Sequence, residues 1–190
     1  MPPGAEHGLQ ARERLLSTAI ELVPERGWSA VSTRILAERA GVSPSVVHYH
    51  FSSMPALLGE AVVTAMRGML AEASALLEAA ETPAEIVDRL VGSVDQYTGA
   101  DPMSLLFVEA YLASTRDDDL RRQIVAEVDG FRSELAASLA NRGVPAAEAT
   151  AAVLSAAIDG LVLHRGLGAG PDTAASARLL RRLVTDIDGG

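Results

Sequence analysis

The sequence predicts an all-α protein: an N-terminal three-helix helix-turn-helix domain followed by a C-terminal helical bundle, with about nine helices in all. Apolar residues recur at intervals of three and four along the long segments, as on one face of an α-helix. No segment alternates apolar and polar residues as a half-buried strand does. Ala and Leu dominate, and both favour helices. Gly, Pro and capping residues then mark where each helix begins and ends.

Composition excludes several classes of protein. The 190 residues include no Cys, so neither disulfides nor thiolate metal sites are expected. The first residues lack the basic and then apolar pattern of a signal sequence, and no apolar run approaches membrane-spanning length. The sequence therefore predicts a cytoplasmic protein with no membrane partner, no metal and no cofactor.

The formal net charge of −9 is unevenly distributed along the chain. Residues 1–53 hold five Arg and five Glu, so the remainder carries the whole negative charge. There is no Lys, and every basic residue is Arg. An acidic bulk repels DNA from everything except the neutral end, which favours a protein of two functional parts.

Residues 1–8 are expected to form a Pro/Gly-rich arm, and a first helix is predicted from Leu9 to about Arg26. The stretch from Val31 to Leu58 then predicts two short helices and the start of a third. Ser32 or Thr33 can cap the first of these helices.

Gly41 is predicted to end that first short helix, because a residue with positive φ is needed there. Ser43 is the expected cap of the next helix, and Pro44 takes its first position, where a missing N–H costs nothing. Val47 and Phe51 are one turn apart and point inward. Such a pattern predicts a helix-turn-helix whose second helix can enter a major groove.

A helical hairpin from any all-α core would show the same pattern, with Val46 and Tyr49 as packing residues. We place the helix-turn-helix domain at residues 9–54. Residues 55–187 form a second helical domain, to which the family resemblance given next assigns effector binding and dimerisation.

The stretch resembles the DNA-binding domain of the TetR family of bacterial transcriptional regulators. The resemblance rests on three segments of this chain: Leu36-Ala37-Glu38-Arg39-Ala40-Gly41-Val42-Ser43, His48-Tyr49-His50-Phe51 and Ser53-Met54-Pro55-Ala56-Leu57-Leu58. Two positions depart from the family pattern. His48 stands where the family has a phosphate-binding Tyr, and Met54 where it has a phosphate-binding Lys. The resemblance also implies that Trp28 packs between the first helices.

The second half predicts a succession of helices with clear boundaries. Three helices are expected at about 55–80, 84–97 and 146–167. Between the second and the third, one helix begins at 102 and another ends at 141–143, and a last helix reaches about Ile187. Thr82 and Glu85 form a capping box before the second of these helices. Residues 109–121 and 157–161 resemble the C-terminal domain of a TetR subgroup that includes the choline and betaine regulator.

The predicted DNA contacts follow from the outward faces of the helix-turn-helix and from the resemblance. Bases or thymine methyl groups are assigned to Pro44, Ser45, Val46 and Tyr49. Phosphates are assigned to Thr33, Arg34, Ser43, His48 and His50.

Two further sets of residues predict a ligand pocket and a dimer. By the resemblance, large adaptable side chains are expected to line an apolar effector pocket, and core packing is the alternative for each of them: Met66, Met69, Tyr97, Met103, Phe107 and Tyr111. The polar anchor candidates are Arg89, Asp95, Glu109 and Asp159, each of which is equally compatible with a surface charge or a buried pair. Small and apolar residues on the last two helices indicate a partner, and the resemblance implies that this partner is a second copy: Ala152, Ser155, Ala156, Asp159, Gly160, Leu163, Leu179 and Leu183.

No catalytic constellation is found. His48 and His50 are two residues apart and point in opposed directions on a helix, so they cannot share a metal. The sequence thus predicts a homodimeric DNA-binding regulator, most simply a repressor released from a pseudo-palindromic operator by a small, mainly apolar effector. The alternative is a helical ligand carrier or adaptor with a decayed helix-turn-helix.

Overall fold

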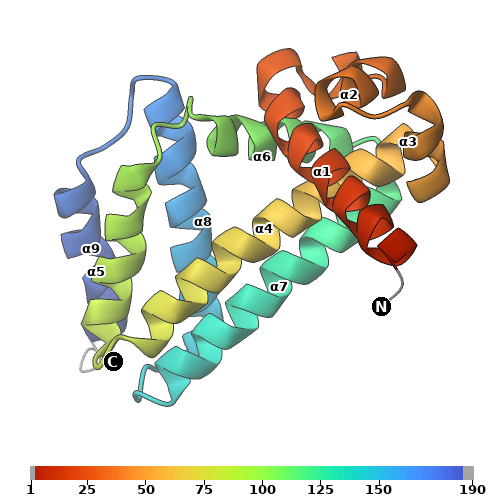
Figure 1. Cartoon of the computed structure of the whole chain (residues 1–190). Coiled ribbons are helices and arrows are strands. Elements are labelled where there is room, and N and C mark those ends of the chain that lie inside the picture. Colours follow the sequence, from red (N-terminus) through yellow and green to blue (C-terminus); the bar gives the residue numbers. More distant parts are fainter. Residues whose placement is uncertain (1–2, 186–190) are drawn as a thin grey trace. The chain divides into compact units, whose positions relative to one another are not determined.

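The computed structural model describes residues 3–185, with side chains from residue 8 onward, and that part of the chain is all helical (Figure 1). This confirms the predicted fold class. The elements are α1 (Pro3–Arg26), the 3₁₀ turn η1 (Trp28–Ala30), α2 (Thr33–Ala40), α3 (Pro44–His50), α4 (Met54–Glu78), α5 (Pro83–Ser93), the 3₁₀ turn η2 (Val94–Gln96), α6 (Pro102–Ser114), α7 (Asp118–Ala140), α8 (Ala147–Gly166) and α9 (Thr173–Thr185). The predicted end of the last helix at Ile187 lies outside the described residues.

Two helix boundaries differ from the prediction. α1 begins at Pro3 rather than Leu9, so residues 3–8 are helical instead of an arm. Proline suits a helix start because the first N–H groups have no partner within the helix, and this outweighs the low propensity of the two glycines that follow. α5 ends at Ser93, and the chain tightens into η2 before reaching Tyr97.

The chain divides into two compact units, each described by itself. The first comprises Met1–Met66 with Leu105–Gln123, and the second Arg67–Ser104 with Ile124–Gly190. The division falls inside α4, which continues without a break past the predicted boundary at residues 54 and 55. The assignment of function to residues 9–54 and 55–187 remains a prediction.

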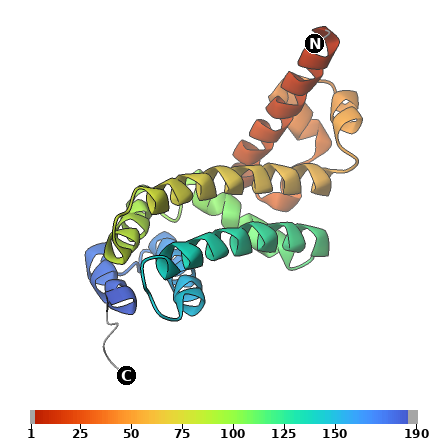
Figure 2. The same ribbon diagram turned by 90° about the horizontal axis from the view of Figure 1, so that it is seen from below.

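In the first unit, α1, α2 and α3 contact one another. In the second unit, α5 packs chiefly against α9, and both contact α8 (Figures 1 and 2). One apolar core joins the elements of this second unit. Its largest fully buried members include Ile86, Val87, Leu135, Leu139 and Leu154.

Most predicted helix caps are present. The Ser32 hydroxyl accepts from the Ile35 N–H at 3.4 Å. The Thr82 hydroxyl accepts from Glu85 N–H at 3.2 Å, and the Glu85 carboxylate accepts in return from the Glu81 N–H at 2.9 Å. Ser43 is the exception, because its hydroxyl bonds the Ser45 hydroxyl at 2.7 Å and not a backbone amide.

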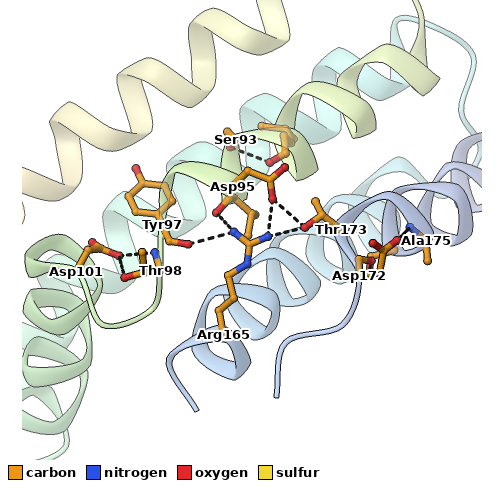
Figure 3. Close-up of polar contacts among 12 residues, drawn as sticks. Ser93, Asp95, Tyr97, Thr98, Asp101, Arg165, Asp172, Thr173 and Ala175 are labelled. Carbon is orange, nitrogen blue, oxygen red and sulfur yellow. Dashed lines mark hydrogen bonds and ion pairs between the residues drawn. The ribbon is translucent and has the colours of Figure 1, made fainter. Parts of the chain in front are cut away.

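Arg165 at the end of α8 joins three segments of the second unit (Figure 3). Its guanidinium donates to the carbonyls of Val94 and Tyr97 at 2.7 and 3.1 Å, and to the Asp95 carboxylate at 2.5 Å. It also bonds the Thr173 hydroxyl, which in turn donates to Asp95 at 2.9 Å. The network therefore ties η2, the end of α8 and the start of α9 together.

A close backbone contact reinforces this junction. Gly99 has φ +75°, and a Cβ added there would lie 2.2 Å from the Gly166 nitrogen. A Cβ on Gly166 would lie 2.6 Å from the Gly99 oxygen. Only glycine fits at either position, because backbone cannot move aside as a flexible side chain can.

The first prediction concerns Asp95. Its pKa is lowered from 3.8, first by the hydrogen bond from Arg165 and next by that from Thr173. The ionised carboxylate therefore stabilises the fold above pH 3.8, and this contribution is lost as the pH falls through the lowered pKa. Asp95→Asn should accordingly lower the urea midpoint at pH 7, and its difference from the wild type should shrink as the pH falls below 3.8. If the urea midpoints of the variant and the wild type differ as much at pH 3 as at pH 7, the charge of Asp95 is not the cause of its contribution to stability.

Candidate nucleic-acid interface

The turn between α2 and α3 holds the two helices in a fixed relation. Gly41 has φ 66° and ψ 35°, the left-handed conformation that favours glycine at a helix end. The Gly41 and Val42 N–H groups donate to the carbonyls of Glu38 and Ala37 at 3.3 and 3.0 Å. These bonds use the last carbonyls of α2, and α3 then begins at Pro44.

The inner face of α3 is anchored in the first unit. Val47 and Phe51 are 2% and 6% exposed, as the sequence predicts. The Arg12 guanidinium of α1 lies 5.0 Å from the centre of the Phe51 ring and also pairs with Glu60 of α4 at 2.5 Å. One cation from α1 thus holds the end of α3 and the first half of α4 together.

The other faces of α3 are open to solvent. Tyr49 is 83% exposed, which excludes the reading of Tyr49 as a packing residue. Ser45 is exposed, whereas Val46 and His50 are half-buried. The rings of Tyr49 and His50 meet edge to face with centres 4.9 Å apart. These side chains, some polar and some apolar, form the outer face of one short helix, and a helix of this size fits the major groove of DNA.

A shallow hollow lies beside this face, where α1 approaches α3. It is lined by Gly8, Ala11, Ser45, Val46, Tyr49 and His50. The two α1 residues were not among the predicted site residues, because nothing local marks a small residue at the start of a helix as a neighbour of α3. Because Gly8 and Ala11 are small, α1 does not cover the outer face of α3 with side chains at this point.

The residues assigned to phosphates lie on α2, on α3 and at the start of α3. Arg34, Ser43 and His48 are exposed, and Thr33 is half-buried at the start of α2. Pro44, assigned to bases, is also exposed. Arg39 is paired instead with Glu25 through two bonds of 3.2 and 2.8 Å. The hydrogen bond from Arg39 lowers the pKa of Glu25. Arg39 therefore belongs to a solvent-exposed ion pair with Glu25.

Comparison with known proteins identifies the family. Residues 15–61 match the model for bacterial regulatory proteins of the tetR family, and residues 81–186 match the tetracyclin repressor-like C-terminal domain. The chain belongs to the TetR family. It is a DNA-binding transcriptional regulator, and this family is one of regulators, not of enzymes.

Individual relatives agree with this assignment. The HTH-type transcriptional regulator BetI of Agrobacterium fabrum is 32% identical over 89% of this chain and 83% of its own length. A regulator from Streptomyces coelicolor A3(2) is 29% identical, covers 93% of this chain and 99% of its own, and superposes with a TM-score of 0.77. A Saccharomonospora viridis regulator crystallised in complex with choline is 25% identical, covers 93% and 94%, and has a TM-score of 0.69.

The predicted effector residues of this TetR-family chain are divided between the units. Met66, Phe107 and Tyr111 belong to the first, and Met69, Tyr97 and Met103 to the second. Met66 is buried, Tyr111 is 69% exposed, and the other four are half-buried. Their role as a pocket remains a prediction.

Two of the polar anchor candidates have partners that the sequence did not reveal. Asp95 pairs with Arg165, and Glu109 accepts a hydrogen bond from the Trp28 N–H at 2.7 Å. Trp28 itself is only half-buried. No group of three or more His, Asp or Glu suited to a metal ion occurs among the described side chains.

The predicted dimer residues form an exposed stripe with one exception. Leu163, Leu179 and Leu183 are 53%, 64% and 46% exposed, Ala152, Ala156 and Asp159 are exposed, and Gly160 is half-buried. Ser155 faces inward instead, at 8% exposed, because it is rotated by about 100° from Ala156 on the helix. Its hydroxyl has no hydrogen-bond partner within residues 8–185.

Two helices contain longer apolar stretches than expected from the sequence. Contrary to the sequence-based expectation, α4 and α8 are long and apolar enough, by length and composition alone, to cross a membrane. The core helix of a soluble protein passes the same test, so this is weak evidence of a membrane location. The most apolar window of α8 is only 11% buried in the single chain, against 39% for α4.

The second prediction concerns Tyr49. Tyr49→Ala should weaken operator binding by a factor of about ten to a hundred, since a central groove contact contributes roughly 1–3 kcal/mol. The melting temperature should stay close to that of the wild type, because the side chain is largely exposed. Gel shifts and thermal melts measure the two effects. A loss of several degrees with unchanged DNA affinity would refute a role in recognition.

The third prediction concerns Met54, the first residue of α4. Met54→Lys should tighten DNA binding by adding a phosphate contact, with little change in sequence preference. Each such contact steepens the log–log salt dependence by about one unit, so about two for a two-fold dimer. The measurement is the operator Kd across a salt series. An unchanged slope would mean that position 54 does not face the backbone.

Proposed function

We propose that this TetR-family regulator acts in the cytoplasm as a homodimeric repressor that leaves a pseudo-palindromic operator when it binds a small, mainly apolar effector. The exposed outer face of α3, held from behind by Val47 and Phe51, carries this proposal. Ser45, Val46 and Tyr49, with Pro44 beside them, would meet base edges and thymine methyl groups. Thr33, Arg34, Ser43, His48 and His50 would position the protein on phosphates.

Recognition by a single α3 is insufficient. The helix has seven residues and reaches few base pairs, whereas a two-fold pair reads two half-sites. The stripe on α8 and α9 supplies a surface for this pairing. Its small residues allow a second helix to approach closely, and its exposed leucines would leave water on association.

Asp159 fits this interface only with compensation. Burial among the neighbouring helices raises the pKa of Asp159, and the charge of Arg132 opposes this rise. The residue still keeps an exposed surface in the single chain. Covering that surface would desolvate the carboxylate further and raise its pKa again, and the Arg132 charge would oppose this rise.

The effector class follows from the adaptable side chains and from the relatives. A quaternary ammonium compound such as choline is compatible with them, because its charge is shielded by methyl groups and aromatic faces bind such cations. Burial raises the pKa of the Tyr97 hydroxyl, and the charges of Glu72 and Asp101 raise it further. Negative charge next to a half-buried ring favours a cationic ligand.

Selection of genomic fragments tests the regulatory role. Fragments retained by the protein should contain a two-fold repeat, and DNase protection should span both halves. Choline and a panel of neutral apolar compounds are then screened for release of the enriched fragment. If no fragment is enriched over sheared DNA, the alternative of a ligand carrier with a decayed helix-turn-helix is favoured.

The fourth prediction tests the dimer. Leu163→Asp should convert the protein to monomers at micromolar concentration and reduce operator affinity more than tenfold, because an unpaired charge would be buried beside Asp159. Val125→Asp is the control, since Val125 on α7 is similarly exposed at 48% but lies outside the predicted stripe. Sedimentation equilibrium measures the mass. A Leu163→Asp variant that remains dimeric would place the interface elsewhere.

A further inference from the structure

The joint between α1 and α2 lacks a cap of its own. Gly27 links α1 to η1 with φ 83° and ψ 152°, and as the N-cap residue of η1 it has no side chain to accept a hydrogen bond. The first turn of η1 contains no acidic residue. The N–H groups at the start of such a turn need an acceptor from elsewhere.

Glu109 of α6 supplies that acceptor. Its Oε2 atom accepts from the Trp28 N–H at 2.7 Å, across 81 residues of sequence. A Cβ built on Gly27 would lie 3.8 Å from both carboxylate oxygens, so the carboxylate sits directly over the bend. A bond of this kind, from a backbone amide to a carboxylate, is among the stronger hydrogen bonds in proteins.

The surroundings of Glu109 show that the bond is specific. The residue is half-buried and its carboxylate accepts from the Trp28 N–H, whereas within residues 8–185 none of the ion pairs includes Glu109. A partly desolvated carboxylate is costly unless its oxygens are used. In contrast, Glu60 and Glu127 each pair with an Arg.

We propose that Glu109 is a positioning residue for DNA binding. By capping η1, it fixes the joint from which α2 leaves α1, and therefore the direction in which α2 and α3 are presented to DNA. Both ends of this bond lie in the first unit, which contains α1–α3 and residues 105–123. Any movement of α6 that stretches this bond would loosen the joint.

The chain contains a single Trp, which lies at this joint and serves as a local probe. Glu109→Ala should increase acrylamide quenching of Trp28 and speed hydrogen exchange of the Trp28 amide by about tenfold or more, since the amide loses its acceptor. These two readouts need no DNA. They therefore test the cap separately from the proposed operator, effector and dimer.

Operator affinity tests the positioning role, using the fragment enriched in the genomic selection. Glu109→Ala should bind it about tenfold more weakly, whereas Glu109→Gln, which retains an amide oxygen as acceptor, should bind within about threefold of the wild type. Glu127→Ala is the matched control: it removes a carboxylate paired with Arg67 at 2.7 Å and should change neither Trp28 nor DNA binding.

Two results would overturn the proposal. The first is an Ala variant in which the Trp28 amide exchanges faster but the operator Kd stays within twofold, since Glu109 would then be a structural cap only. The second is a Gln variant as defective as the Ala variant, which would exclude the hydrogen bond as the cause. A sheared-DNA titration of each variant separates a general loss of folding from a loss of recognition.

Discussion

A recognition helix of seven residues is too short to be stable in water by itself, because isolated helices below about a dozen residues are marginal. Its conformation and its direction depend on tertiary contacts made by one face. Val47 and Phe51 supply that face, and Arg12 covers the Phe51 ring while pairing with α4. The remaining faces are thereby left open to solvent, and their side chains contribute little to the stability of the fold. Tyr49 is the clearest case of a large ring that packs little against its own chain.

The features predicted correctly are those that depend on neighbours in sequence. Helical periodicity located the helices, and local chemistry located the caps at Ser32 and Thr82 and the left-handed Gly41. The outward position of Tyr49 followed from the inward position of Val47. The prediction was wrong for the Ser43 cap, where two local hydrogen bonds compete. The Ser43 hydroxyl bonds the neighbouring Ser45 hydroxyl instead of a free backbone amide of α3.

Contacts between segments that are distant in sequence could not be predicted, because no local sequence pattern marks them. Arg165 reaches residues about 70 positions away, and Glu109 reaches Trp28 from 81 positions away. Each is one charged residue on a helix and would look the same in sequence if it faced solvent. For Asp95 and Glu109 the sequence therefore left a ligand anchor, a surface charge and a buried pair as equal alternatives, and the structure shows a partner within the protein for each. The junction of Gly99 with Gly166 was equally invisible, because two glycines carry no information about mutual approach.

Charge distribution sets how this regulator can bind DNA. The residues up to position 53 are neutral, the rest carry the net charge of −9, and Glu25 offsets Arg39 within the first unit. Counterion release by a large basic surface therefore contributes less than it does for a typical DNA-binding domain. Uncharged hydrogen bonds, apolar contacts and the fixed direction of α3 therefore carry a larger share of the affinity. Under that constraint, a small loss of order at the α1–α2 joint removes a larger share of the binding free energy than it would in a strongly basic protein. The α1–α2 joint is held by the Glu109 carboxylate of α6, which lies outside the helix-turn-helix. Because the first 53 residues carry no net charge, the direction of α3 that this joint sets matters more for DNA binding.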